Sequence, residues 1–166
     1  WDACPETTPD PLAKVKAWGG LDLSSTQDTT AFTLCWPMPA AKYAFKTWIW
    51  IPEDTARRKE KEDRVPYRAW HEDGFINFTP GEIVDYAYIR AAINGLSEQY
   101  LIQDIGFDSW NATQLALQLQ NEDGLELVEF RQGYKTMSPA AKEYEKLIMS
   151  GALVHVGRNP VMRWMA

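Results

Sequence analysis

The segment from Trp18 to Phe32 constrains the fold of this chain more than any other. It places a carboxylate, Asp22, inside an apolar strand and follows it with a polar turn. An ionised carboxylate without a partner in an apolar setting costs several kcal/mol, or else it becomes protonated. A bound divalent cation supplies such a partner. The sequence therefore predicts a strand that carries a cation-binding aspartate.

The size and composition of the chain predict one globular domain. Its 166 residues are 45% hydrophobic and 13% aromatic, enough for one substantial core. Residues 1–16 carry three prolines and few apolar side chains, so we expect a linker there and a single domain over 17–166. The chain starts with Trp1 and contains neither a signal peptide nor an apolar span of bilayer length. We therefore expect a piece of a longer, soluble polypeptide.

The order of the expected elements predicts an α/β fold. Three β-rich runs separated by short turns indicate an antiparallel meander; they cover 17–23, 30–37 and 43–51. A helix capped by Thr79 follows, then a strand that ends at Asp108, and then a second helix. A strand over 125–130, a helix capped by Ser138 and a short strand over 152–156 come next. We expect a central mixed five-stranded sheet, three strands antiparallel and two parallel, flanked by helices.

The segment Arg57–Arg64 allows two interpretations. It has five positive and three negative residues, too many charges for a core and too mixed in sign for a simple nucleic-acid patch. One interpretation is a solvated helix or a mobile loop. The other is a flap over a substrate, in which Arg57, Arg58 and Lys59 contact phosphates.

Charge, cysteines and histidines exclude several function classes. The net charge of −6 argues against a free-standing DNA-binding module, although an acidic metal site in a nuclease is compatible with it. Two cysteines cannot form a four-cysteine zinc site, and we expect no disulfide between Cys4 and Cys35. His71 and His155 lack metal-ligand spacing, so we expect structural roles for both.

Asp22 and Asp108 are the candidate site residues. Asp22 lies in the first expected strand and Asp108 ends the fourth, so both carboxylates reach one cation if these two strands are neighbours. Two divalent ions bridged by a carboxylate can position a water for attack on phosphorus and stabilise the leaving oxygen. The pair therefore predicts metal-dependent phosphodiester chemistry.

Several spaced motifs resemble a known family. In order, they are Gly-Gly-Leu-Asp22-Leu-Ser, Phe107-Asp108-Ser-Trp, the segment Gln132–Pro139, Leu153-Val-His155, Asn159-Pro and Trp164. Over Trp18–Ala166 the chain resembles the nuclease domain of phage large terminase subunits of the HK97-like group. The resemblance implies a ribonuclease H-like fold and an endonuclease that cuts concatemeric double-stranded phage DNA.

The resemblance also implies the cofactor, partners and setting of the domain. Asp22 and Asp108 match two acidic ligands of a two-metal site for Mg²⁺ or Mn²⁺. The implied partners are double-stranded DNA, a portal protein, a small terminase subunit and an ATPase domain upstream in the same polypeptide; no Gly-x-x-x-x-Gly-Lys-[Ser/Thr] loop occurs in this chain. The implied location is the host cytoplasm, at the procapsid.

The third acidic ligand of the family is not matched. It would follow Trp164, and the chain reaches Ala166 before another acidic residue, so we expect a domain truncated at its C-terminus. Substitutes within the chain are weaker. Glu143 and Glu145 are expected on a solvated helix face, and Asp28 in a turn. Asp104 shares a strand face with Asp108, but pairing with a nearby lysine is the simpler expectation for it.

Two other functions remain open at this point. A resolvase or transposase core of the same fold would use similar carboxylates on different DNA. A non-catalytic docking module would use the eight tryptophans for interface contacts. A docking module would tolerate Asp22→Asn, whereas a nuclease would not.

Overall fold

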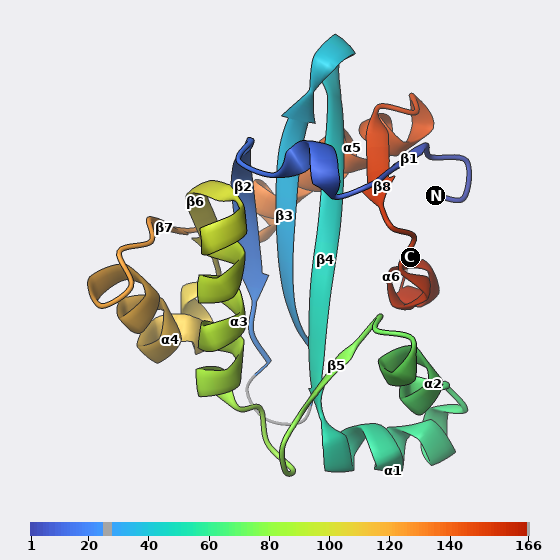
Figure 1. Ribbon diagram of the computed structural model, residues 1–166, viewed down its shortest axis with the longest axis vertical. Helices are drawn as coiled ribbons and strands as arrows, with labels where there is room; N and C mark the ends of the chain where they lie inside the picture. The colour runs from blue at the N-terminus through green and yellow to red at the C-terminus, as the bar shows by residue number, and fades with distance from the viewer. Residues whose placement is uncertain (25–27, 166) are drawn as a thin grey trace.

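A mixed sheet forms the centre of the molecule (Figure 1). The computed structural model describes residues 1–24 and 28–165, and for residues 10, 63 and 109–113 it describes the backbone only. Seven strands follow the order β1-β8-β4-β3-β2-β6-β7, and β5 pairs separately with β4. The strands are β1 (Glu6–Thr7), β2 (Lys16–Asp22), β3 (Thr30–Met38), β4 (Lys42–Pro52), β5 (Asn77–Thr79), β6 (Leu101–Phe107), β7 (Leu127–Glu129) and β8 (Leu153–Val156).

Helices cover both faces of the sheet, with α3 in front and α5 behind in the view of Figure 1. The α-helices are α1 (Glu53–Asp63), α2 (Tyr67–Glu72), α3 (Tyr86–Gln99), α4 (Ser109–Asn121), α5 (Tyr134–Met149) and α6 (Pro160–Met165). Two short 3₁₀ turns are η1 (Asp10–Leu12) and η2 (Pro39–Ala41). None of the helices in the described part of the chain is long and apolar enough to cross a membrane.

The predicted meander and the predicted parallel pair are confirmed. β2, β3 and β4 pair antiparallel in sequence order, and β6 lies parallel to β2 with β7 parallel to β6. Along β3 the side chains alternate between a buried face, which includes Phe32, Leu34 and Trp36, and a partly open face, which includes Thr33 and Cys35. This period of two is the pattern that the sequence shows.

The sheet has more strands than the expected five. β8 pairs parallel with the start of β4, β1 pairs with β8, and β5 pairs with the end of β4. β8 is the short strand that the sequence predicts over 152–156, although its place beside β4 is not part of that prediction. β1 and β5 have only two and three residues, too few for a period of two to be recognised in the sequence.

Residues 1–16 pack against the domain, which corrects the expectation of a linker outside the core. The side chains of Cys4 and Leu12 are only 2% and 4% exposed, and Leu12 belongs to the main core. Pro11 lies in the 3₁₀ turn η1, and only Glu6–Thr7 of this segment form a strand. Whether an ATPase domain precedes this segment stays a prediction.

Two helices begin at other residues than expected. Thr79 ends β5, and α3 is capped instead by the Asp85 carboxylate, which accepts hydrogen bonds from the amides of Ala87 and Tyr88 at 2.9 and 3.2 Å. α5 begins after Gly133, with Pro139 inside the helix rather than at its first turn. At α3 the Asp85 carboxylate thus satisfies terminal amides that Thr79 does not reach. The N-cap of α5 is Gly133, whose amide donates to Oγ1 of Thr136 at 3.2 Å.

The charged segment 57–64 belongs largely to α1, as the solvated-helix interpretation predicts. Arg57 pairs with Glu53 one turn earlier at 2.5 Å, and both side chains are exposed. Lys59 reaches Asp28, beyond the end of β2, at 3.2 Å. α1 therefore lies beside the β2–β3 connection.

Candidate active site

Strand pairing brings the two predicted site residues together. β2 and β6 run parallel, with Leu21 opposite Phe107. Asp22 follows Leu21, and Asp108 follows Phe107. The two aspartates therefore lie next to each other at the carboxyl ends of neighbouring strands. Ligand sites in open sheets gather at this edge. The condition that the sequence left open, that these two strands are neighbours, is met.

Both carboxylates line one open groove of about 400 Å³. Its floor is formed by the strands β2, β3 and β6, including Gly20, Ala31 and Gly106. An added Cβ at Gly20 would meet no atom within 4 Å, so the groove is open above this residue. Its wall comes from Phe130, Gln132 and Met137, on the segment that leads from β7 into α5.

Core side chains of the neighbouring strands occupy the space beside Gly19 of β2. An added Cβ at Gly19 would lie 2.9 Å from Cγ1 of Ile105 and 3.1 Å from the Phe32 ring. The glycine therefore leaves room for these two core side chains. The Gly-Gly pair has two distinct roles: Gly19 accommodates the core, and Gly20 leaves the groove open.

Asp22 is exposed rather than buried, which corrects the starting argument from the sequence. The alternation of β2 buries Leu21 and turns Asp22 to the opposite, open face. Burial cost therefore does not require a cation at Asp22. The argument for a cation comes from the neighbouring carboxylate: like charges side by side repel each other, and a divalent ion removes this repulsion.

The described residues contain no group of three or more histidine, cysteine or acidic side chains placed to hold a metal ion. Asp104 is absent from the groove lining, and Glu143 pairs with Lys146 on α5 at 3.2 Å. Glu145 is exposed. Within the described chain the groove thus offers two carboxylates and no substitute for a third.

Asp28 has a structural role, as the turn interpretation predicts. Its carboxylate accepts a hydrogen bond from the amide of Thr29 at 2.8 Å and another from Lys59 at 3.2 Å. Partial burial acts to raise the pKa of Asp28, but these two partners outweigh it and leave the pKa below its ordinary value. The contact joins the β2–β3 connection to α1.

The histidines and cysteines lie outside the groove. His71 stacks on Phe78 with ring centroids 4.1 Å apart, and its Nδ1 lies 3.0 Å from the carbonyl oxygen of Ile76. His155 is buried beside Trp1. Cys4 and Cys35 are both free thiols. Structural roles fit both histidines.

The wall of the groove could not be predicted from the sequence. Gln132 and Met137 belong to the segment that carries part of the resemblance, and Phe130 belongs to an expected strand, so neither pattern indicates a place in a site. The available signal was a strand followed closely by an amphipathic helix, which alone does not show that the connection borders a site.

Comparisons with known proteins agree with this geometry. The fold and the paired carboxylates at the strand ends define a mixed α/β domain of the nuclease type. The model of the family "Terminase large subunit, endonuclease domain" matches residues 1–166, and the chain belongs to this family.

Two curated proteins are similar to the chain. The large terminase subunit of Enterobacteria phage HK97 is 32% identical over 171 residues, which cover 100% of this chain and 32% of that protein. Protein YmfN of Escherichia coli K12 is 36% identical over 126 residues, which cover 74% of this chain and 27% of that protein. The chain thus spans about a third or less of the length of these relatives.

A solved structure confirms the predicted fold. The crystal structure of the HK97 large terminase matches with a TM-score of 0.85 and 32% identity, covering 97% of this chain and 33% of that one. The mixed sheet flanked by helices is therefore the ribonuclease H-like architecture that the resemblance implied. The family match disfavours the resolvase or transposase interpretation.

Proposed function

We propose that this terminase nuclease domain hydrolyses phosphodiester bonds of double-stranded DNA with the help of Mg²⁺ or Mn²⁺ held by Asp22 and Asp108. The single observation that carries the proposal is the placement of both carboxylates at the ends of paired parallel strands in one groove. Carboxylate oxygens are the protein ligands that these hard cations prefer.

The residues present fit such an ion in part. The Asp22 carboxylate has no hydrogen bond or ion pair to any residue that the structure describes, and so it is available to a ligand. Mg²⁺ is commonly bound through one or two carboxylates, with water and phosphate oxygens completing its shell. When bound, such an ion supplies a Lewis acid and an activated water. A two-ion site would need at least one more acidic ligand than the described groove contains.

The chain's own groups define the rest of the proposed site. The open space above Gly20 gives a phosphodiester access to the carboxylates from the exposed side of the sheet. Without a cation the paired aspartates repel a phosphate, which makes substrate binding itself dependent on the metal. We expect contacts to the DNA backbone more than to base edges, because the described residues of the groove lining include no cluster of base-reading side chains.

The setting follows from the family as a proposal. We propose that the substrate is concatemeric phage DNA, cut in the host cytoplasm at the procapsid. The partners would be a portal protein, a small terminase subunit and an ATPase domain of the same polypeptide.

Plasmid cleavage tests this function. The 166-residue chain and a form extended beyond Ala166 are incubated with supercoiled plasmid and Mg²⁺, Mn²⁺ or EDTA, and relaxed and linear products are measured. Asp22→Asn and Asp108→Asn should each reduce cleavage by more than about 100-fold, because losing residues that only orient metal ligands already costs about 10–100-fold. Asp104→Asn is the matched control, because Asp104 lies on β6, the strand that ends just before Asp108, but does not line the groove.

The outcomes separate the alternatives. Cleavage that needs metal and both aspartates supports the nuclease, and cleavage by the extended form alone assigns an essential ligand to the added segment. Cleavage that survives Asp22→Asn at an unchanged rate would refute the proposed site. If neither the unsubstituted 166-residue chain nor its extended form cuts DNA although both are folded, the docking module is favoured.

A further inference from the structure

The sheet has a gap along the outer edge of β4. β8 pairs with β4 over Tyr43–Phe45, and β5 pairs with it over Trp50–Pro52. Between these two segments no strand of the described chain pairs with that edge of β4 (Figure 1). At about 3.3 Å per residue, the uncovered stretch is about 16 Å long.

Backbone hydrogen-bonding groups of β4 point into this gap. The side-chain Nδ2 of Asn77 donates to the carbonyl oxygen of Ile49 at 3.2 Å, which shows that Ile49 faces the outer edge. In a strand, the backbone groups of residues two apart face the same edge, so the amide and carbonyl of Thr47 also point outward. Neither has a partner strand within the described chain. An edge with free donors and acceptors is a template for another strand.

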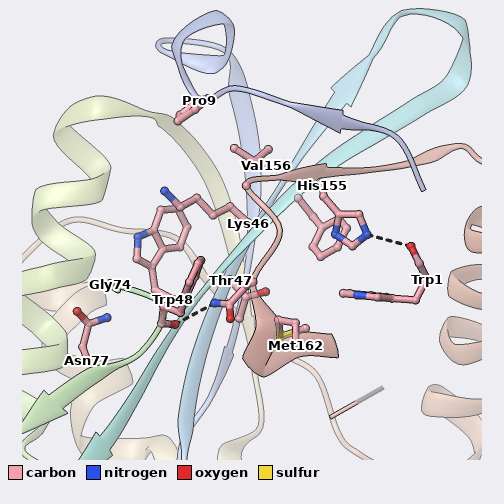
Figure 2. Close-up of a pocket in the computed structure, with 14 residues that line it drawn as sticks. Trp1, Pro9, Lys46, Thr47, Trp48, Gly74, Asn77, His155, Val156 and Met162 are labelled. Carbon is pink, nitrogen blue, oxygen red and sulfur yellow. Dashed lines mark hydrogen bonds between the residues drawn. The ribbon is translucent and has the colours of Figure 1, made fainter. Parts of the chain in front are cut away.

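A cleft of about 360 Å³ occupies the gap, and its two sides differ in chemistry (Figure 2). On one side the ammonium of Lys46 lies 5.0 Å from the centre of the Trp48 ring. On the other side His155 packs edge-on against Trp1, with ring centroids 4.5 Å apart, and lies 5.0 Å from the Phe45 ring. The cleft is therefore cationic on one face of β4 and aromatic on the other.

The cationic side lacks a counter-charge. Among the described residues that line the cleft there is no aspartate or glutamate, although the whole chain has a net charge of −6. Within the described chain the ammonium of Lys46 forms no salt bridge, and partial burial lowers the pKa of Lys46. An anionic group in the cleft would compensate this desolvated charge.

We propose that this cleft binds an extended peptide segment of a partner protein, which adds a short strand to β4 and places an acidic side chain beside Lys46 and apolar side chains against Phe45 and His155. Side chains of a strand alternate between faces, so the two unlike sides of the cleft select the order apolar, acidic, apolar. Backbone pairing supplies affinity and the side-chain pockets supply specificity, as in other cases of strand addition. The proposal is independent of the nuclease function, because the cleft shares no lining residue with the Asp22 groove.

A peptide fits these observations better than a nucleic acid. Among the described lining residues the cleft has only one cationic side chain, that of Lys46, whereas binding of a polyanion depends on several lysines and arginines. A nucleic-acid backbone also has no amide that could pair with both the amide and the carbonyl of Thr47. A peptide strand supplies a donor and an acceptor at the required alternation.

Fluorescence anisotropy with a labelled peptide tests the proposal on the 166-residue chain. The probe is acetyl-Thr-Ile-Glu-Ile-Thr-amide with a fluorescein label, compared with versions that carry Gln or Lys in place of Glu. We expect the Glu peptide to bind at least about tenfold tighter than the Lys peptide, as for a hydrogen bond to a charged group. Lys46→Gln should abolish this preference, and Lys42→Gln, on the same strand but outside the cleft, should leave it unchanged.

Backbone methylation tests strand addition itself. Two further peptides carry an N-methyl group on the Glu or on the following Ile. Only one edge of an added strand faces β4, so one methylated peptide should lose at least about tenfold in affinity while the other stays close to the parent. Loss in neither or in both would refute strand addition.

Other occupants give different results, each of which overturns the proposal. An eight-nucleotide oligothymidine that binds with Lys46 dependence, while no peptide binds, would make the cleft a nucleic-acid site. Self-association in sedimentation experiments that Lys46→Gln abolishes, again without peptide binding, would assign the cleft to a second copy of the chain. Equal affinities for the Glu and Lys peptides would show that Lys46 does not select an acidic side chain.

Discussion

The two faces of the sheet differ in how deeply the covering helices bury their side chains. On the front face α3 contributes Ile89 and Ile93, both fully buried, to the core that contains Phe32 and Trp36. On the rear face α5 has sixteen residues and none of them is buried; Tyr134 at its start is 88% exposed. β2 and β3 thus bury their side chains on the front face and leave those on the rear face exposed or partly exposed.

This difference shows where stability and function reside. The sealed face supplies most of the apolar burial that holds the sheet together. The rear face keeps the groove with Asp22 and Asp108 next to a loosely packed helix, so a substrate needs little rearrangement to reach it. Strand alternation alone separates the two functions, because neighbouring residues such as Leu21 and Asp22 point to opposite faces.

The largest difference is expected from side-chain truncation on the two faces. Phe32→Ala should lower the free energy of unfolding by about 3–5 kcal/mol, because it leaves a cavity in the sealed core. Met137→Ala, on the exposed side of α5, should change it by less than about 1 kcal/mol. Urea unfolding followed by circular dichroism measures both. Similar losses for the two variants would show that the rear face is packed as tightly as the front.

The Gly-Gly pair of β2 allows the same comparison one residue apart. Gly19→Ala should destabilise the fold by about 1–3 kcal/mol, because its methyl group would overlap Ile105 and Phe32. Gly20→Ala should stay within about 0.5 kcal/mol, because its methyl group would enter open space. Thermal unfolding of the two variants ranks them. A larger loss for Gly20→Ala would mean that the open face is the crowded one.

A third test concerns the contact between α3 and the end of α4, on the sealed side. The Arg90 guanidinium donates two hydrogen bonds to the Asp123 carboxylate, at 2.6 and 2.7 Å, and so holds the pKa of Asp123 below its ordinary value. A lowered pKa in the folded state contributes stability that is present above the ordinary pKa of about 3.8 and is lost as the pH falls through the lower folded value.

Acid unfolding should therefore distinguish the wild-type protein from Asp123→Asn. We expect the wild-type melting temperature to fall more steeply between pH 5 and 2 than that of Asp123→Asn, so that the gap between the two narrows on acidification. Asp73→Asn, at the C-terminal end of α2, is the control. Parallel acid profiles for wild-type and Asp123→Asn would refute a stabilising role for this pair.

The three meander strands and the two aspartates at strand ends could be predicted from the sequence because they depend on local patterns. Apolar alternation marks the three meander strands, and an acidic residue at a strand end marks Asp108. The exposure of Asp22 could not be predicted in this way. An apolar run of a few residues does not reveal which side chains face a helix-covered side and which face a groove.

Other features depend on contacts distant in the sequence. The burial of Cys4 requires Phe45 and Leu153, and β1 exists only because β8 lies beside it. The cleft on β4 arises because β8 ends and β5 begins several residues apart along β4, which no local pattern records. The places of short segments that pack against residues distant in the sequence therefore could not be predicted.

The smallest expected effect tests whether α5 rests on the rear face at all. Tyr144 of α5 lines a cavity over the sheet together with Cys35 and Phe45, and burial raises the pKa of Tyr144 to about 12. The neutral phenol is thus favoured in the folded state, so its stabilising contribution is present below the ordinary pKa of about 10 and is lost as the pH rises through about 12. The absorbance at 295 nm of wild type minus Tyr144→Phe isolates this titration. A midpoint near 12 that moves to about 10 in urea supports packing of α5 on the sheet. A midpoint near 10 in the native protein would mean that α5 does not pack on the sheet and that the rear face is more open than the groove alone indicates.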